Sequence, residues 1–268
     1  MDTPKSDKAV PARGPESLTG LAFGGGVVLG AAHIGVLKAM HEVGFTADCV
    51  AGTSIGSFIA ALHAFGKSWE EIETVALDLD WSDLSGLTIS GYGLLSIRKF
   101  GDIVKRMLGS RRIEDAQIPL AIVATDICTG RKVVMRRGDV ALAVMASSSI
   151  PGIFRPVEYR GMLLVDGVLT ENVPVSPLSD MGANRIVCID LLGRHTFRRP
   201  EHMATLLLNS FYSAMRAVSQ MQIQGADLVI SPDLSAFSLV DMSAVPAILE
   251  TGYREALPVL KTWMELER

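Results

Sequence analysis

The sequence is poor in cysteine, with three in 268 residues, and none of them belongs to a Cys-x-x-Cys pair. This excludes a disulfide framework and gives no zinc or thioredoxin-like motif, so we expect reduced thiols, no metal site and a cytoplasmic protein. Basic residues are not in excess either, because 25 Lys and Arg stand against 29 Asp and Glu, for a formal net charge of −4. This balance argues against nucleic acid as the main partner.

Charged residues make up only 20% of the chain, and 49% of its residues are hydrophobic. A chain this apolar can bury a large core, which excludes intrinsic disorder as its main state. Residues 17–37 contain no Asp, Glu, Lys or Arg and are long enough to span a bilayer. Three consecutive glycines, Gly24–Gly26, make a poor helix centre, however. We therefore interpret this segment as a buried strand, a glycine turn and a buried helix.

The first 17 residues differ in composition from the rest of the chain. Residues 1–17 hold three prolines among polar and charged residues, and we expect a disordered tail there. Residues 18–268 are expected to form one domain.

Strand and helix patterns alternate at the start of this domain. An apolar strand at 18–23 leads into a helix over about 30–43, capped by Gly44, and a second strand at 48–51 leads into a second helix. This order predicts an α/β fold with a parallel sheet covered by helices. The further expected elements are helices at 69–79, 97–108, 140–146, 202–224 and 244–264 (interrupted near Pro258), strands at 119–125, 132–135, 162–165, 185–190 and 227–231, and a glycine-rich loop at 85–93.

The most informative segment is Gly52-Thr53-Ser54-Ile55-Gly56, a G-x-S-x-G sequence between a predicted strand and a predicted helix. A serine on a sharp strand-to-helix turn needs small neighbours because the chain passes close to itself, so Gly52 and Gly56 are the expected elbow glycines. The helix that follows points its positive end toward Ser54 and favours negative charge developing there. Ser54 is the candidate nucleophile, and a tight turn with a capping serine is the structural alternative.

A second glycine-rich turn, Gly24-Gly25-Gly26, follows the first predicted strand and leads into a helix. Such a turn presents backbone N–H groups that can hold a phosphate or an oxyanion. The turn matches neither the P-loop pattern nor G-x-G-x-x-G, so it gives no nucleotide-cofactor motif. An oxyanion hole made by the N–H groups of Gly25, Gly26 and Val27 fits better, because a candidate nucleophile follows only one helix later.

A nucleophilic serine needs a base. None of the five histidines lies in the last 66 residues, although α/β-hydrolases carry their catalytic histidine late in the chain. Asp166, directly after the predicted strand 162–165, is well placed to act instead. A carboxylate is a weak base at its ordinary pKa of about 3.9, so its site must be partly desolvated. An α/β-hydrolase with His195 or His202 as the base is the alternative.

Several segments of the chain resemble the bacterial patatin-like phospholipases. They are the glycine-rich segment Leu21–Leu37, the G-x-S-x-G of Gly52–Gly56, the strand segment Ala121–Gly130, and the segments Ser147–Phe154 and Val165–Val175 before and around Asp166. The match covers residues 18–235 in the family's order. This resemblance implies a three-layer α/β/α sandwich with a mostly parallel central sheet.

The resemblance also implies a chemistry. Ser54 is the expected nucleophile and Asp166 the expected base of a serine esterase that cleaves acyl esters of phospholipids or lysophospholipids through an acyl-enzyme. No metal or organic cofactor is implied. The expected partner is a lipid or acyl ester substrate, met in the cytoplasm or by peripheral contact with the inner face of the membrane.

The sequence departs from the family pattern at three positions. The family's glycine segment reads G-G-G-x-[RK]-G, and laid on Gly25–Gly30 it puts Val27 at the third glycine and Leu29 at the basic residue. A register with Gly24–Gly26 as the three glycines restores them but adds one residue before Gly30. Val168 stands where the family has Gly or Ala. A β-branched residue resists positive φ, so Val27 is expected to misdirect one oxyanion donor. Two alternatives follow: a lipid-binding or regulatory pseudoenzyme on the same fold, and an acyltransferase that uses the same dyad.

Overall fold

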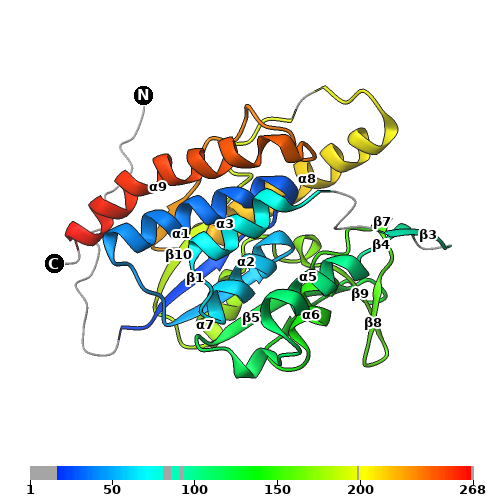
Figure 1. Cartoon of the computed structure of the whole chain (residues 1–268), viewed down its shortest axis with the longest axis horizontal. Coiled ribbons are helices and arrows are strands. Elements are labelled where there is room, and N and C mark those ends of the chain that lie inside the picture. The colour runs from blue at the N-terminus through cyan, green and yellow to red at the C-terminus, as the bar shows by residue number, and fades with distance from the viewer. Residues whose placement is uncertain (1–16, 81–85, 91–92, 198, 267–268) are drawn as a thin grey trace.

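The computed structural model describes residues 17–80, 86–90, 93–197 and 199–266, so the expected tail of residues 1–17 lies outside the described residues except for Ser17. A mixed, mostly parallel sheet stands at the centre, and helices cover both of its faces (Figure 1). The α/β sandwich predicted from the sequence is therefore confirmed.

The strands of the central sheet are adjacent in an order that differs from their order along the chain. Five neighbouring strands pair in parallel, from β11 to β5 in the order given below. The last two strands in that order, β9 and β8, are joined by antiparallel pairing, and β6 pairs antiparallel with the other edge of β5. The order is β11 (Leu228–Ile230), β10 (Arg185–Ile189), β1 (Thr19–Phe23), β2 (Cys49–Thr53), β5 (Leu120–Asp126), β9 (Met162–Asp166) and β8 (Val157–Tyr159), with β6 (Arg131–Met135) paired to β5.

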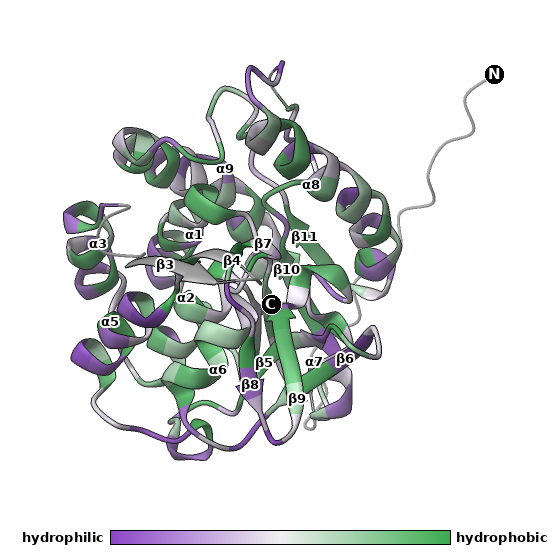
Figure 2. Ribbon diagram, turned by 90° about the vertical axis from the view of Figure 1, so that its right-hand side faces the viewer, coloured by the Kyte–Doolittle hydropathy of each residue, from purple (hydrophilic) through white to green (hydrophobic). Residues whose placement is uncertain are grey.

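The helices form two layers, one on each side of this sheet (Figure 2). The larger layer contains α1 (Ala31–Val43), α2 (Ile55–Ala64), α3 (Trp69–Asp78), α5 (Arg98–Leu108), α6 (Val140–Ser147) and α9 (Val245–Leu266), and the smaller contains α7 (Val175–Asp180) and α8 (Met203–Gln222). Successive residues of β1 serve the two layers, since Leu21 and Phe23 belong to the larger hydrophobic core and Ala22 to the smaller. This alternation is the period of two expected of a strand covered on both faces.

Local signals explain where several helices begin and end. Gly44 takes the left-handed conformation (φ 70°) at the end of α1, as its predicted role as a cap requires. Ser68 accepts a hydrogen bond from the N–H of Glu71, whose side chain accepts from the N–H of Ser68, and this capping box starts α3.

Two expectations about local structure are wrong. Part of the expected glycine-rich loop at 85–93 pairs as β3 (Gly86–Ser90) and β4 (Gly93–Ser96), and β4 also pairs with β7 (Gly152–Phe154). The last helix is not interrupted, because α9 continues through Pro258. Pro258 is exposed, so solvent can satisfy the carbonyl that its missing N–H leaves free, and packing of α9 along α1 keeps the helix intact.

Residues 17–37 form strand and helix as expected, with β1, a short 3₁₀ turn at Val27–Gly30 and the start of α1. Within the described ranges, no helix combines the length and the apolar character that a membrane span requires.

Candidate active site

The pairing of the sheet brings the ends of β2 and β9 together. Thr53, the last residue of β2, pairs with Val123 of β5, and Asp166, the last residue of β9, pairs with Ala124. Since β6 occupies the other edge of β5 at these positions, β2 and β9 lie end to end along one edge. They run in opposite directions, so their carboxyl ends meet. This register places Ser54, which follows β2 directly, beside Asp166.

Ser54 stands on the tight turn between β2 and α2. Its backbone angles are φ 55° and ψ −129°, a conformation that residues other than glycine rarely adopt. A Cβ atom at Gly52 would collide with the carbonyl oxygen of Gly56, and one at Gly56 would collide with that of Phe23. Close backbone contacts therefore require both glycines, and the strained serine has the geometry of a nucleophile elbow.

The hydroxyl of Ser54 donates a hydrogen bond to Oδ2 of Asp166 across 2.7 Å. The other carboxylate oxygen, Oδ1, accepts from the N–H of Val168 at 2.9 Å. Asp166 is fully buried, and burial raises its pKa to about 7, while the hydrogen bonds from Val168 and Ser54 act in the opposite direction. The carboxylate is therefore a stronger base than an exposed aspartate, and it lies within reach of the serine proton.

The glycine turn lies against Ser54, and its first two N–H groups are already engaged. Gly24 donates to the carbonyl of Ile189, and Gly25 donates to the backbone carbonyl and Oδ1 of Asn172 at 3.3 and 3.1 Å. Gly25 was expected to be an oxyanion donor, but its N–H is held by Asn172. Over the described ranges, no protein group accepts a hydrogen bond from the N–H of Gly26 or Val27.

Val27 adopts the conformation that its side chain was expected to resist. Its φ is 52°, in the left-handed region, although valine is β-branched. The residue also lies at the start of a 3₁₀ turn whose next N–H, that of Val28, donates to the carbonyl of Leu239. Contacts around the turn therefore hold Val27 in place at a cost in backbone strain.

His33 anchors the same turn from α1. Its Nε2 lies 2.7 Å from the carbonyl oxygen of Gly24, and the ring packs edge-on against Phe23. Burial lowers the pKa of His33 to about 4, so the ring is neutral near pH 7 and donates its Nε2–H to that carbonyl.

Neither of the two histidines considered as alternative bases accepts a hydrogen bond from the Ser54 hydroxyl. The Nδ1 of buried His195 lies 3.0 Å from the carbonyl of Leu234, and His202 is exposed at the start of α8. The hydroxyl of Ser54 donates to Asp166 instead.

Three consecutive serines flank the dyad. The Ser147 hydroxyl accepts the N–H of Ser54 at 2.8 Å and donates to the carbonyl of Val123 at 2.6 Å. The carbonyl of Ser149 accepts the N–H of Asp166. Ser147 thus connects the turn at Ser54 to β5, and Ser149 connects the backbone of Asp166 to the end of α6.

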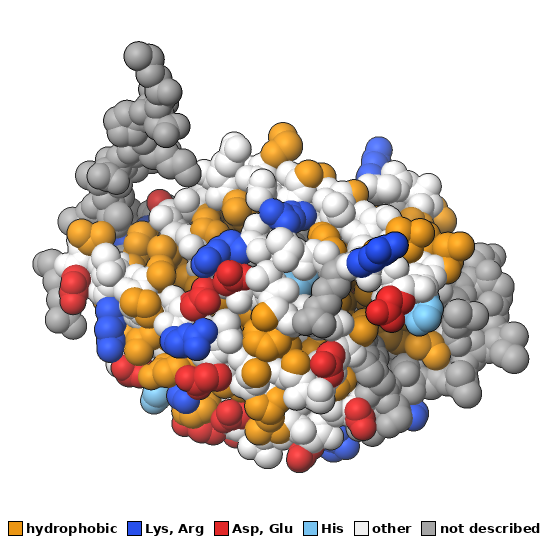
Figure 3. All heavy atoms as spheres, turned by 90° about the horizontal axis from the view of Figure 1, so that it is seen from above, with side chains coloured by type: hydrophobic (Ala, Val, Ile, Leu, Met, Phe, Trp, Pro, Cys, Tyr) orange, Lys and Arg blue, Asp and Glu red, His pale blue; other side chains and the backbone are white. Residues whose placement is uncertain are grey.

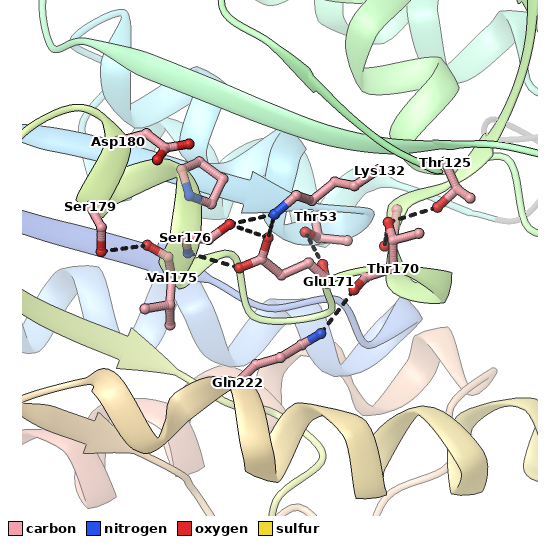
Figure 4. Close-up of polar contacts among 12 residues, drawn as sticks. Thr53, Thr125, Lys132, Thr170, Glu171, Val175, Ser176, Ser179, Asp180 and Gln222 are labelled. Carbon is pink, nitrogen blue, oxygen red and sulfur yellow. Dashed lines mark hydrogen bonds and ion pairs between the residues drawn. The ribbon is translucent and has the colours of Figure 1, made fainter. Parts of the chain in front are cut away.

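The segment after Asp166 is fastened by a polar network that the sequence gave no sign of (Figure 4). The carboxylate of Glu171, which is buried, accepts from Lys132 Nζ at 2.7 Å and from the N–H and hydroxyl of Ser176 at 2.8 Å each. The carbonyl of Glu171 accepts the Thr53 hydroxyl at 2.8 Å. Glu171 and the neighbouring Asn172 therefore join the nucleophile strand and the glycine turn to the segment that carries Asp166.

A cavity of about 130 Å³ opens at Ser54. Among the described residues that line it, only Ser54 and Ser148 carry polar side chains, and the other walls are aliphatic or aromatic, including Phe58, Phe100 and Phe154. The Ser148 hydroxyl is buried without a hydrogen-bond partner. An apolar cavity with a serine hydroxyl in its wall suits a hydrocarbon chain that ends in a reactive polar group.

In the part of the chain that the structure describes, no group of three or more His, Cys, Asp or Glu side chains is arranged to hold a metal ion.

Comparison with known proteins identifies the family. The profile of the patatin-like phospholipases matches residues 21–179, more than half of the chain. The chain belongs to the patatin-like phospholipase family. A protein of Mycobacterium bovis described as an uncharacterized NTE family protein is 35% identical over 178 residues, which cover 65% of this chain and 49% of the relative. A Lysophospholipase NTE1 of Cryptococcus neoformans is 32% identical over 64% of this chain and 11% of its own length.

A second NTE family protein of Mycobacterium bovis is 29% identical over 93% of this chain and 47% of its own length. The chain thus spans about half the length of these mycobacterial relatives. Among solved structures, VipD from Legionella pneumophila superposes with a TM-score of 0.63 at 14% identity, over 94% of this chain and 68% of VipD. The type III effector ExoU gives a TM-score of 0.51 at 14% identity, over 92% of this chain and 53% of ExoU. These structures share the fold.

The structure accounts for the other two departures from the family pattern. Leu29, at the position of the basic residue, is fully buried in the larger core, where an unpaired cation would be strongly destabilising. Val168 is also buried, and it contributes its backbone N–H to Asp166, a role that any residue except proline can fill.

Proposed function

We propose that this chain is a serine esterase that hydrolyses acyl esters of phospholipids or lysophospholipids, with Ser54 as nucleophile and Asp166 as base. The observation that carries the proposal is the 2.7 Å hydrogen bond from the Ser54 hydroxyl to the buried Asp166 carboxylate, in the wall of an apolar cavity. Membership of the patatin-like phospholipase family supports the same chemistry.

In the proposed mechanism the acyl chain occupies the apolar cavity and its ester carbonyl lies against Ser54. Asp166 takes the proton as the Ser54 oxygen attacks the carbonyl carbon, and the N–H groups of Gly26 and Val27 stabilise the oxyanion. Asp166 returns the proton to the departing alcohol, which leaves an acyl-enzyme. Water, deprotonated by Asp166, then attacks the acyl-enzyme and releases the fatty acid.

The free N–H of Val27 favours this proposal over the pseudoenzyme alternative. Val27 was expected to misdirect an oxyanion donor because valine resists positive φ, but it adopts a φ of 52°, in the left-handed region that glycine favours. The loop therefore keeps two unengaged donors beside the nucleophile, at Gly26 and Val27.

Hydrolysis of a series of p-nitrophenyl esters of increasing acyl length tests the proposal. We expect the wild type to turn over esters of medium and long acyl chains, and Ser54→Ala and Asp166→Asn to lose at least 10³-fold in kcat/KM. His195→Asn and His202→Asn are matched controls and should retain activity within about threefold. A folded wild type without esterase activity, or a loss at either histidine equal to that at Asp166, would refute it.

A further inference from the structure

We propose that a cluster of exposed apolar side chains at the start of α8 docks this protein on the surface of a zwitterionic lipid aggregate. The cluster, called here the rim patch, consists of Met203, Leu206, Leu207 and Val240. The inference rests on the proposed function in one respect, that the lipid delivered there is the substrate of Ser54.

The rim patch is exposed although it is apolar. Met203 is 72% exposed, Leu207 62%, Leu206 47% and Val240 41%. Large aliphatic side chains exposed singly are common on protein surfaces, but a group of them marks a surface that binds another apolar body. Figure 3 shows hydrophobic side chains at the surface on the side of the molecule where α8 lies.

The rim patch lies at the same end of α8 as the cavity that holds Ser54. Leu208, next to Leu207 along α8, lines that cavity, and so does Val240. Leu208 and Val240 also line a second, smaller cavity beside it, together with Thr205 and Asn209 of α8. A lipid aggregate docked at the start of α8 therefore lies near a cavity with apolar walls that leads to Ser54, which is itself only 3% exposed.

The charges near the rim patch indicate which kind of lipid surface it fits. Helix α8 contains no Asp or Glu, and its single charged residue, Arg216, donates to the carbonyl of His195. Beside the patch, the sequence has two arginines, Arg198 and Arg199, and two acids, Glu201 and Asp241. These two positive and two negative charges cancel, so they give no net cationic attraction to anionic headgroups, and we assign the patch to zwitterionic lipid.

The size of the rim patch argues against a second copy of the chain as its occupant. Four partly exposed aliphatic side chains present a few hundred Å² at most, and a stable dimer buries about 800 Å² on each partner. Insertion of a few side chains into a lipid surface has no such minimum, because each methylene buried in the hydrocarbon adds its own favourable transfer.

Helix α8 supplies an internal control for the experiment. Met221 has the same exposure as Met203, 72%, and is the same residue type. Eighteen residues separate the two, which is five full turns at 3.6 residues per turn, so both side chains project from the same face of the helix about 27 Å apart. Met221 does not belong to the rim patch and lies outside the residues that line the cavities at Leu208.

The experiment measures co-sedimentation with phosphatidylcholine vesicles for the wild type, Met203→Asp/Leu207→Asp and Met221→Asp. We expect the double variant to bind vesicles at least tenfold more weakly and Met221→Asp to bind within twofold of the wild type. The double variant should also lose hydrolysis of vesicle lipid while it keeps hydrolysis of p-nitrophenyl butyrate, which is soluble. Unchanged circular dichroism and an unchanged melting temperature would show that the variants are folded.

Three results would overturn the proposal. They are unchanged vesicle binding by the double variant, an equal loss of vesicle binding by Met221→Asp, and a wild-type protein that is dimeric while the double variant is monomeric. Stronger binding of the wild type to vesicles rich in phosphatidylserine than to phosphatidylcholine would also contradict the zwitterionic assignment. Vesicle binding requires no turnover, so failure of the esterase proposal would appear separately, as a wild type that binds vesicles but leaves p-nitrophenyl butyrate intact.

Discussion

At the scale of single residues, Asp166 combines two properties that oppose each other. Its proposed role needs the ionised form, but complete burial disfavours charge and raises its pKa to about 7. The hydrogen bonds from Ser54 and Val168 compensate only in part. A base whose pKa lies near neutral pH is well matched to proton transfer, and the same burial makes the folded state less stable when the group ionises.

We expect Asp166→Asn to be more stable than the wild type at pH 8. Between about pH 4 and pH 7 the unfolded chain releases a proton that the folded chain keeps, so the wild type loses stability as the pH rises through this window. Asparagine removes the titration and still accepts from Val168. The gain in free energy of unfolding should be on the order of 2–4 kcal/mol at pH 8 and shrink toward pH 4, measured by urea denaturation. An equal difference at both pH values would contradict this.

Val27 is a second residue on which the proposed chemistry depends, in this case through its backbone N–H. Its φ of 52° is already in the left-handed region that glycine adopts without strain. We therefore expect Val27→Gly to change kcat/KM by less than about threefold, since the substitution relieves strain without supplying a new donor. Steady-state hydrolysis of one p-nitrophenyl ester checks this. A gain of 10² or more would show that valine misdirects the donor, because that is the usual effect of one oxyanion contact.

At the scale of elements, the site depends on one segment, Glu171–Asn172, that joins three parts of the chain. It holds the end of β2 through Thr53, the glycine turn through Gly25, and β6 through Lys132. All of these contacts lie outside the reacting atoms, so they position the nucleophile and the oxyanion donors without taking part in the reaction.

Asn172→Ala should lower kcat 10- to 100-fold with little change in KM. The variant removes the side-chain acceptor of the Gly25 N–H and leaves only the longer bond to the backbone carbonyl, so the turn that presents the N–H groups of Gly26 and Val27 is held less firmly. Asn172 does not line the cavity proposed to bind the acyl chain, so KM should change little. Lys132→Met is the matched control, because it weakens the same network but leaves Asn172 in place. We expect it to lower the melting temperature while kcat stays within about threefold. If both variants lost kcat equally, the effect would be one of general stability.

At the scale of the whole molecule, the features that could be predicted from sequence are the local ones. The βαβα start, the elbow at Gly52–Gly56 and the cap at Gly44 each follow from residues that are neighbours in the chain. The contact between Ser54 and Asp166 depends on the antiparallel register of β9 against β5. The sequence offered Asp166 as a candidate base because it ends a predicted strand, and the family resemblance paired it with Ser54.

Other features had no local signal at all. The acceptor of the Gly25 N–H, Asn172, lies 147 residues away, so nothing around the glycine turn indicated that this donor was engaged. The pairing of β3, β4 and β7 was missed because glycine-rich sequence favours a loop in isolation. Pro258 was expected to break α9, but long-range packing of α9 on α1 outweighs one missing backbone hydrogen bond.

The most direct test of the central claim is to trap the acyl-enzyme. The wild type is mixed with a long-chain p-nitrophenyl ester, quenched in acid during turnover, and analysed by intact mass and peptide mapping. The account predicts one acyl group on the peptide that contains Ser54, and none in Ser54→Ala. An acyl group on another residue, or turnover with no trapped acyl group under conditions that show a burst of p-nitrophenol, would contradict it.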